Sequence, residues 1–526
     1  MITERERWTS RIGLILAMAG NAVGLGNFLR FPVQAAQNGG GAFMIPYFIA
    51  FFLLAIPLMW VEWSIGRHGG KFGHGSMPGM LDSMWKSPIA KYLGVLGLWV
   101  STIVMIYYTY IESWTLGFAY FSLTGEYFGM DNLTNMESFL KSYQGAGEGY
   151  FSSILTAYIF LLITIAANLF ILYKGISKGI EWFAKFAMPT LIFFGIVLLI
   201  YVFTVGVPDP INFPDRSVWN GFAFIWNPDF SLLSDSKIWL AASGQVFFTL
   251  SVGMGTLHAY ASYLRESDDL ALSGLSTASI NEFVEVILGG SIAIPIAVAF
   301  FGLTTATAIA MGGSFNLGFV SMSVIFQQIP FGSLIGFLWF FLLFFAGITS
   351  SVAMAQPVIS FLKEQFKFSQ KKAVTFVGIG LFVCIHFVIF FLKFGFLDEM
   401  DYWAGTFALV AVALIEVVVF AWIYGMDKGW AELTKGSDIK VPRFFYYIIK
   451  YVTPTYLIGI MAFWTWDSAI PTLMMKGVPA ENVPYLWGAR LMMLTIFGLL
   501  VFMVYRGWKM NDHKYEHFND NIKAKK

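Results

Sequence analysis

Long apolar segments recur along the whole chain and constrain its fold more than any other feature. Twelve of them reach the ~20 residues that a helix needs to cross the hydrocarbon core of a bilayer. Lipid offers no partner to backbone N–H and C=O groups, so each segment is expected to be a transmembrane helix in an all-α polytopic membrane protein. The segments lie near 12–36, 41–67, 89–122, 153–173, 178–205, 238–263, 271–303, 333–362, 372–393, 399–424, 443–467 and 484–508.

The composition agrees with a surface that faces lipid. Hydrophobic residues make up 57% of the 526 residues and charged residues 12%, whereas an average soluble chain has about 25% charged residues. The formal net charge of +1 gives no field that would attract nucleic acid, so the lipid bilayer is the expected partner. The single cysteine, Cys384, excludes a disulfide framework.

Lysine and arginine accumulate in alternate connections between the apolar segments. Of 33 basic residues, 25 fall in the N-terminal segment, in every second connection or in the C-terminal tail. Because basic loops stay on the cytoplasmic side, both termini are predicted to be cytoplasmic in a multi-pass protein of the plasma membrane. No small-residue cleavage site follows the charged segment 1–11, so the first helix is expected to remain in the mature protein.

Two of the segments are interrupted by glycine, at Gly20–Gly26 and at Thr249–Gly255. They lie five helices apart, and since five is odd, the two halves of the chain would have inverted orientations. Freed backbone groups are tolerated at membrane depth only around a cavity. Paired interruptions of this kind therefore indicate a transport site between broken helices.

Each interruption also has a simpler interpretation. Gly20 and Gly24 have the spacing of a helix-packing motif, and the second interruption could be a plain glycine kink. Asn21 and Asn27 favour a ligand site at the first interruption, because carboxamides are costly to bury unused.

Polar side chains lie within two further spans. Asn281 and Glu285 are four residues apart and share one helical face, and a charge at that depth usually indicates function. Thr349 and Ser350 offer hard oxygen ligands for a small cation, or they only bond back to their own helix.

No catalytic set can be assembled from the spans. Glu62 and Glu112 are expected to be protonated or bonded to freed backbone amides. Four histidines form no cluster in the sequence: His68, His74, His258 and His386. Without a nucleophile and base, a zinc set or a phosphate loop, an enzyme is not expected. The alternatives to a transporter are a channel and an amino-acid sensor built on the same scaffold.

Several longer motifs have a familiar form. They are Arg5-Glu6-Arg7-Trp8, AMAGNAVGLGNFLRFP at Ala17–Pro32, GGGAFMIPY at Gly39–Tyr47, FFAGITSS at Phe344–Ser351 and LDEMDYWAGT at Leu397–Thr406. Together they resemble the neurotransmitter:sodium symporter family, and within it the bacterial leucine-transporter branch. The resemblance implies two inverted five-helix repeats, 12–205 and 238–424, joined by an extracellular loop at 206–237. It also implies an N-terminal gate segment at 1–11, helices 11 and 12 within 425–508, and a cytoplasmic tail at 509–526.

The resemblance further implies two sodium ions, no organic cofactor and one amino-acid substrate. The first sodium site would use Ala22, Asn27, Thr249 and Asn281 with a carboxylate oxygen of the substrate, and the second would use Gly20, Val23, Ala346, Thr349 and Ser350. The substrate would contact Asn21, Ala22, Gly24, Leu25, Gly26, Val104, Tyr108, Phe248, Thr249, Ser251, Met254, Ser350 and Met354. Met254 and Met354 depart from the leucine carrier, so leucine-like or methionine-like side chains are both expected.

Two positions imply the ion and substrate chemistry. Monoamine carriers of the family have an aspartate where Gly24 stands, so a ligand that brings its own carboxylate is expected. Chloride-dependent relatives have a small hydroxyl residue where Glu285 stands, so a fixed carboxylate replaces the anion and transport is predicted to be chloride-independent. Protonation of Glu285 on the return step would add proton counter-transport.

The family pattern also implies two gates for alternating access. The outer gate would consist of Arg30 with Asp401 and of Phe248 over Tyr108, and the inner gate of Arg5, Trp8, Ser262, Tyr263 and Glu364. Glu364 is a departure, since the close relative has aspartate there. A second copy of the chain, in a homodimer, is a candidate partner.

Overall fold

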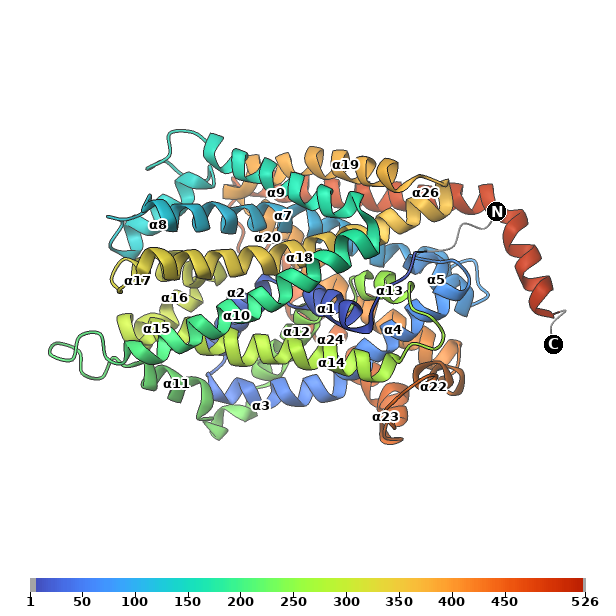
Figure 1. The fold of residues 1–526 in the computed structure, drawn as a ribbon, viewed down its shortest axis with the longest axis horizontal. Helices are drawn as coiled ribbons and strands as arrows, with labels where there is room; N and C mark the ends of the chain where they lie inside the picture. Colours follow the sequence, from blue (N-terminus) through green and yellow to red (C-terminus); the bar gives the residue numbers. More distant parts are fainter. Residues whose placement is uncertain (1–5, 524–526) are drawn as a thin grey trace.

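A computed structural model describes residues 6–523, with side chains as far as Asn511. The described residues form helices and connecting turns, with no strand among them. Among the described residues, nine helices are long and apolar enough to cross a membrane, and α1 (Arg11–Ala22) with α2 (Leu25–Gln37) forms a tenth span that is bent by 47°. The spans run roughly parallel to the long axis of the molecule (Figure 1).

The nine spans match the predicted segments, although several contain short π-helical or 3-10 turns, labelled η. They are Gly41–Lys71 (α3 Gly41–Ala50, η1 Phe51–Ala55, α4 Ile56–Lys71), Ala90–Thr124 (α6 Ala90–Leu93, α7 Val95–Thr124), α9 Leu155–Tyr173, Ile176–Val205 (η2 Ile176–Glu181, α10 Trp182–Val205), Leu270–Phe301 (α14 Leu270–Glu282, η4 Phe283–Gly289, α15 Gly290–Phe301), α18 Gly332–Phe366, Gln370–Phe394 (α19 Gln370–Phe391, η6 Leu392–Phe394), Phe396–Ile423 (α20 Phe396–Met400, η7 Asp401–Ala408, α21 Leu409–Val418, η8 Val419–Ile423) and α26 Val483–Lys523.

Two predicted segments fold as shorter pieces. The segment near 238–263 is split into α12 (Ser236–Thr249) and α13 (Thr256–Ala261), with six residues between them that are not helical. The segment near 443–467 consists of α23 (Phe444–Tyr447), η9 (Ile448–Val452), α24 (Thr453–Trp464), η10 (Thr465–Ala469) and α25 (Ile470–Leu473). With these two, each of the twelve predicted segments has a helical counterpart.

Short helices cover both ends of the bundle. The end that carries both chain termini, called the terminal end below, has α5 (Met77–Met84) and α22 (Met426–Thr434); it lies at the right in Figure 1. At the opposite end lie α8 (Leu133–Tyr143), α11 (Val218–Trp226), η3 (Phe230–Ser234), α16 (Leu303–Met311), η5 (Asn316–Ser321) and α17 (Met322–Phe326). The segment 304–330 folds back at this end, because α16 and η5 both pack against α2.

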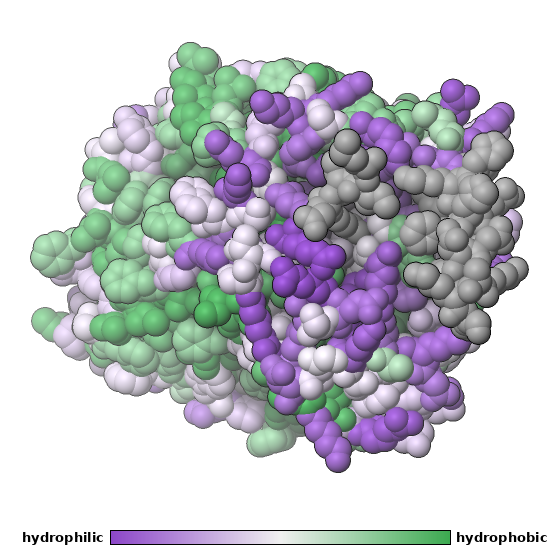
Figure 2. Space-filling view, turned by 45° about the vertical axis from the view of Figure 1, so that its right-hand side comes forward, coloured by the Kyte–Doolittle hydropathy of each residue, from purple (hydrophilic) through white to green (hydrophobic). Residues whose placement is uncertain are grey.

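Burial separates central from peripheral helices. In α7 and in the span 270–301, 83% of the most apolar stretch is buried inside the protein, against 28% in α26. Large apolar side chains such as Phe193, Phe390 and Leu494 are more than half exposed, as expected where the solvent is lipid. Hydrophilic residues gather instead at the terminal end, which faces the viewer in Figure 2. The central helices are therefore the ones that enclose the site.

Candidate transport site

The first interruption is a two-residue break between α1 and α2. α1 ends at Ala22, and Val23 and Gly24 have extended backbone angles before α2 begins at Leu25. The Leu25 N–H donates to the Tyr108 hydroxyl at 2.9 Å. A Cβ on Gly24 would lie 2.8 Å from that same hydroxyl, so the close approach requires glycine. The break is shorter than the predicted interruption Gly20–Gly26, because α1 runs through Ala22 and α2 begins at Leu25.

The second break, 250–255, meets the first. Ser251 has a left-handed backbone with φ of +55°, and Gly253 and Gly255 also have positive φ. The Ser251 hydroxyl donates to the Asn21 carbonyl at 2.9 Å, so the backbone of one break is bonded to the other. The Gly253 N–H donates to the Glu62 carboxylate at 2.6 Å. This contact confirms that Glu62 binds a freed backbone amide.

Three residues predicted for the first sodium site form one buried cluster. The Asn27 amide donates to the Asn281 side-chain oxygen at 2.9 Å and to the Thr249 hydroxyl at 3.2 Å. The Asn281 amide donates to the same Thr249 hydroxyl at 3.0 Å. All three side chains are at most 1% exposed, and Ala22, at the last turn of α1, is 2% exposed. Hard oxygen atoms are thus concentrated where two helices break.

Glu285 lies beside this cluster. Four side chains hydrogen-bond to its carboxyl group: Tyr47, Gln245, Thr249 and Asn281. The sequence did not single out Glu282, which also contacts the Tyr47 hydroxyl at 3.0 Å. A phenol has one proton and can donate to only one of these two carboxyls. The other contact is satisfied when that carboxyl carries a proton of its own.

The residues predicted for the second sodium site also converge. The Ser350 hydroxyl lies 3.3 Å from the Gly20 carbonyl and 3.1 Å from the Ala346 carbonyl, which links α1 to α18. The Thr349 hydroxyl donates to Phe345 and Ala346 carbonyls on its own helix. Gly20 packs so closely on Thr349 that a Cβ there would lie 3.0 Å from the threonine Cβ. Val23 follows in the break, so all five predicted groups lie where α1 meets α18.

The residues predicted to contact the substrate side chain are buried and mostly apolar. Val104, Met254 and Met354 are at most 2% exposed. Phe248, at the end of α12, covers the break: a Cβ on Gly26 would lie 2.5 Å from its ring. The Arg30 guanidinium stacks over that ring, 4.2 Å from the ring centre. Phe248 also lines a cavity, together with Leu25, Gly26 and Tyr108, so this cavity reaches the start of α2.

This cavity, of about 290 Å³, lies at the opposite end of the bundle from the termini. Its walls include Arg30, Phe248 and Asp401 and also Gly312–Phe315 of the folded-back segment. The predicted pairing of Arg30 with Asp401 is not present among the described residues, because Asp401 accepts a hydrogen bond from Tyr107 at 2.6 Å instead. The two charges face one cavity without forming an ion pair, and the cation–π contact with Phe248 holds Arg30 aside.

The predicted inner-gate residues lie at the terminal end. The Trp8 indole donates to the Tyr260 carbonyl at 3.1 Å, which holds the segment before α1 against α13. The Tyr263 hydroxyl contacts Ser360, and Ser262 donates to the Ala259 carbonyl on its own helix. Arg5 lies outside the described residues.

Glu364 has a partner that sequence reasoning missed. It forms a short contact with the His74 ring and accepts a hydrogen bond from the Gly75 N–H at 3.1 Å. Both partners lie in the turn between α4 and α5, so Glu364 joins α18 to that turn. The predicted inner-gate carboxylate is therefore engaged by histidine in this structure.

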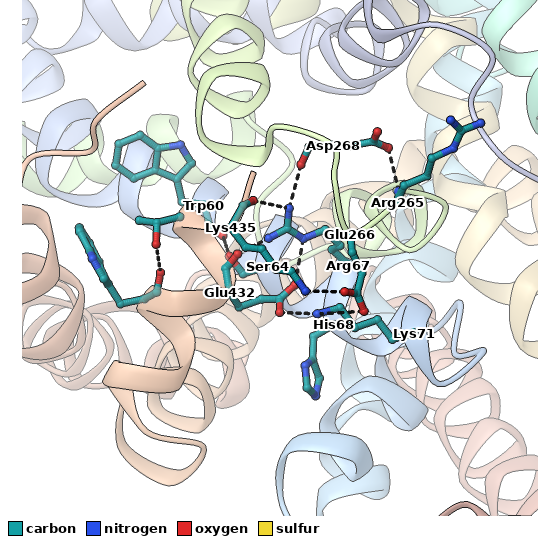
Figure 3. Close-up of polar contacts among 12 residues, drawn as sticks. Trp60, Ser64, Arg67, His68, Lys71, Arg265, Glu266, Asp268, Glu432 and Lys435 are labelled. Atoms are coloured by element: carbon teal, nitrogen blue, oxygen red, sulfur yellow. Dashed lines mark hydrogen bonds and ion pairs between the residues drawn. The ribbon is translucent and has the colours of Figure 1, made fainter. Parts of the chain in front are cut away.

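A larger charged network surrounds Arg67 at the terminal end (Figure 3). The Arg67 side chain is fully buried and its Nε donates to Glu432 at 2.9 Å. Its other nitrogens donate to backbone carbonyls of Glu432, Asp268 and Lys435. Lys71 reaches the second Glu432 oxygen at 2.5 Å. One guanidinium thus joins α4, α22 and the connection between α13 and α14.

The carboxylates of this network are held ionised. Burial raises the pKa of Glu432, but the hydrogen bond from Lys71 and the charge of Arg67 outweigh it, so its pKa lies below the ordinary value. The hydrogen bond from Lys435 and the charge of Lys71 likewise lower the pKa of Glu266. Sequence reasoning missed this network, because its members come from separate segments of the chain.

Comparison with known proteins identifies the scaffold. The model of the Sodium:neurotransmitter symporter family matches residues 5–145 and 148–509. The chain belongs to this family. An uncharacterized sodium-dependent transporter of Methanocaldococcus jannaschii is 31% identical over 470 residues, which cover 87% of this chain and 90% of that relative. A second uncharacterized sodium-dependent transporter, from Haemophilus influenzae, is 27% identical over 482 residues, which cover 87% of this chain and 97% of that protein.

A solved structure of the symporter family has the same fold. The crystal structure of MhsT in complex with L-phenylalanine superimposes with a TM-score of 0.74, at 26% identity, over 87% of this chain and 99% of that chain. The predicted fold class is confirmed, and the chain is a multi-pass membrane protein that carries out sodium-coupled transport. Because its relatives are transporters, the prediction that it is not an enzyme is confirmed as well.

Proposed function

We propose that the chain imports a neutral, apolar L-amino acid, leucine-like or methionine-like in size, together with sodium. The observation that carries the proposal is the bare backbone at Gly24. A side chain there would collide with the Tyr108 and Ser350 hydroxyls, so the protein supplies no carboxylate of its own at the start of α2. A ligand that brings a carboxylate would meet the positive end of the α2 dipole and the Leu25 N–H.

The remaining parts of an amino acid have matching surroundings. Carbonyl groups of Ala22, Phe248 and Thr249 lie at helix ends, where the dipole is negative and favours an ammonium group. Val104, Met254 and Met354 offer a dry apolar wall for the side chain. The relative MhsT has been crystallised with L-phenylalanine, which supports a neutral amino acid as the class of substrate.

Two sodium ions are proposed to travel with the substrate. The cluster of Asn27, Thr249 and Asn281 supports one site, where a substrate carboxylate oxygen would complete the ligand set. The oxygens at the contact between α1 and α18 support the second, which would stabilise the state open to the cavity. Coupling then follows, because the ligand set of the first ion is incomplete without the amino acid.

Transport is proposed to proceed by alternating access. In one state the site opens to the cavity beside Phe248, and in the other it opens at the terminal end. The cavity above Phe248 would open to the outside of the plasma membrane, and both termini would be cytoplasmic. Opening inward would require Trp8 to leave the Tyr260 carbonyl and the Arg67 network to loosen.

Uptake into proteoliposomes tests this function. The purified protein, with an inward sodium gradient, is given labelled leucine, methionine or phenylalanine, and potassium replaces sodium in the control. We expect saturable uptake that collapses without the gradient. Uptake that survives in potassium would contradict sodium coupling, and sodium-dependent binding without flux would identify a sensor.

Lower internal pH should accelerate uptake if Glu285 returns protonated. Uptake that does not depend on internal pH would exclude proton counter-transport.

Replacing Glu285 with serine should make uptake depend on chloride. The Gln245, Thr249 and Tyr47 donors that now bind the carboxylate would surround an empty position that attracts an anion. Wild-type uptake should be equal in chloride and gluconate, whereas Glu285→Ser should be active only in chloride. Glu282→Ser is the matched control, because Glu282 contacts Tyr47 but neither Gln245 nor Thr249. A Glu285→Ser variant with equal uptake in both salts would contradict the assignment.

A further inference from the structure

A histidine lies between two carboxylates in the interior of the bundle, apart from the sodium and substrate residues. His258 on α13 has its Nδ1 3.1 Å from Glu62 on α4. Its Nε2 is 3.6 Å from Glu416 on α21. All three side chains are 0% exposed. This cluster could not be predicted from the sequence, because its members come from three separate spans and the histidines are scattered.

The hydrogen-bonding capacity of the cluster is mostly unused. One Glu62 oxygen, both His258 nitrogens and both Glu416 oxygens have no hydrogen-bond partner of good geometry. In the part of the chain that the structure describes, no lysine or arginine pairs with either carboxylate. Two ionised carboxylates without a cation are very costly at this depth, so the site must take up positive charge from solution.

The geometry distinguishes a proton from a metal ion. A metal would bind one imidazole nitrogen and draw both carboxylates to that nitrogen. Here each ring nitrogen faces a different carboxylate, one toward α4 and the other toward α21. A protonated imidazole would place its positive charge 3.1 Å from one carboxylate and 3.6 Å from the other, so it would attract both at once. The arrangement therefore fits protons better than a metal ion.

Other titratable groups nearby have partners elsewhere. α13 packs against α4, α18 and α1, and α21 packs against α4, α7, α12, α24, η7 and η8. The titratable or charged residues on these elements include Arg67 and His68 on α4, Glu112 on α7, Glu364 on α18, Arg11 on α1, Tyr260 and Tyr263 at α13, Asp401 in η7 and Tyr456 on α24. Glu112 accepts a hydrogen bond from Asn168, and Asp401 accepts one from Tyr107. Arg67, Glu364 and Arg11 are engaged with Glu432, His74 and Asp269 respectively. None of them neutralises the cluster.

The cluster is connected to the second broken helix. The other Glu62 oxygen accepts the Gly253 N–H at 2.6 Å, inside the break between α12 and α13. A Cβ on Gly253 would lie 2.3 Å from the Leu409 carbonyl, so the break is pressed against α21 at this point. His258 follows the break by one helical turn. A change of charge at the cluster would therefore act on the segment that bends around the transport site.

We propose that Glu62, His258 and Glu416 form a proton-binding site that stabilises the break between α12 and α13 in this conformation. Protons taken up from water neutralise the two carboxylates, with one held on the imidazole between them. Their loss leaves carboxylates facing each other across a neutral ring, and because Glu62 stays bound to the Gly253 N–H, the repulsion between the carboxylates acts on the break. The site does not use the sodium or substrate residues, so it stands independently of the proposed substrate.

Thermal unfolding of the purified full-length protein, without substrate or sodium, tests the proposal between pH 5 and 9. The wild type should lose several degrees of melting temperature as pH rises, because the deprotonated cluster is repulsive. His258→Gln should flatten this dependence, and His386→Gln, on the peripheral α19, should leave it unchanged. Glu416→Gln keeps the shape and removes one charge, so it should also flatten the profile if His258→Gln fails to fold.

Two outcomes would overturn the proposal. Wild-type, His258→Gln and Glu416→Gln profiles that run parallel over the whole pH range would show that the cluster does not titrate. Added Zn²⁺ that raises the melting temperature of the wild type but not of His258→Gln would identify a metal site instead. Neither measurement depends on amino-acid uptake, so failure of the proposed substrate would not affect this test.

Discussion

Replacing Gly24 with alanine is expected to reduce sodium-driven amino-acid uptake strongly, by lowering the affinity for the substrate. The added Cβ would lie 2.8 Å from the Tyr108 hydroxyl and 3.0 Å from the Ser350 Oγ, where the substrate carboxylate and the second sodium ion are proposed to bind. The backbone of Gly24, with φ of −121°, accepts alanine without strain, so the effect comes from lost space alone. Overpacking of about 1–3 kcal/mol corresponds to a roughly five- to 150-fold loss of affinity.

Gly380→Ala is the matched control for this substitution. Gly380 lies in α19, and a Cβ there would meet no atom within 4 Å. Alanine is also the better helix former by about 1 kcal/mol. Uptake, binding of labelled substrate and thermal stability are compared for the two variants. Normal uptake by Gly24→Ala, with normal folding of both variants, would contradict the proposed position of the substrate carboxylate.

Replacing Arg67 with alanine is expected to destabilise the protein by about 3–5 kcal/mol. The substitution removes a guanidinium that is fully buried and leaves Glu432, whose side chain is 7% exposed, with Lys71 as its remaining cation. Backbone carbonyls of Asp268 and Lys435 also lose their donor. Unfolding of the purified protein in mixed detergent measures the change in free energy. The same loss should favour the state open at the terminal end, which cysteine accessibility there would detect.

Lys141→Ala is the control for Arg67→Ala. Lys141 pairs with Glu137 on the surface of α8, where the two side chains are 56% and 42% exposed. Such a pair contributes about 0–1 kcal/mol, because water screens it. Adding Glu432→Gln to Arg67→Ala should recover part of the lost stability, since a neutral amide tolerates burial better than a carboxylate. Equal losses for Arg67→Ala and Lys141→Ala would show that the network is not stabilising.

The sequence predicted the bundle well, and the reason is physical. A helix in lipid must satisfy its own backbone and must be long enough to cross, so length and hydropathy alone place it. The same rule exposed the two breaks at Gly20–Gly26 and Thr249–Gly255, since irregular backbone at that depth needs a cavity. Local patterns also placed Asn281 and Glu285 on one face, and the structure brings both to Thr249.

Contacts between distant side chains were harder to predict. Arg30 and Asp401 were expected to pair, yet Arg30 stacks on Phe248 and Asp401 binds Tyr107. The choice depends on competition among partners within a few ångströms, and no sequence spacing reports that competition. Glu364 is a second example, because its partner His74 lies 290 residues earlier in the chain.

By itself, the sequence determined that this protein is a helical membrane bundle with two broken helices. Those features follow from local rules, because lipid imposes backbone satisfaction on each segment separately. Only the tertiary structure decided which buried charges meet: Arg67 with Glu432, and His258 with Glu62 and Glu416. Each of these contacts depends on how several helices pack. In a medium of low dielectric constant, a charge is stable only beside the partner that this packing brings to it.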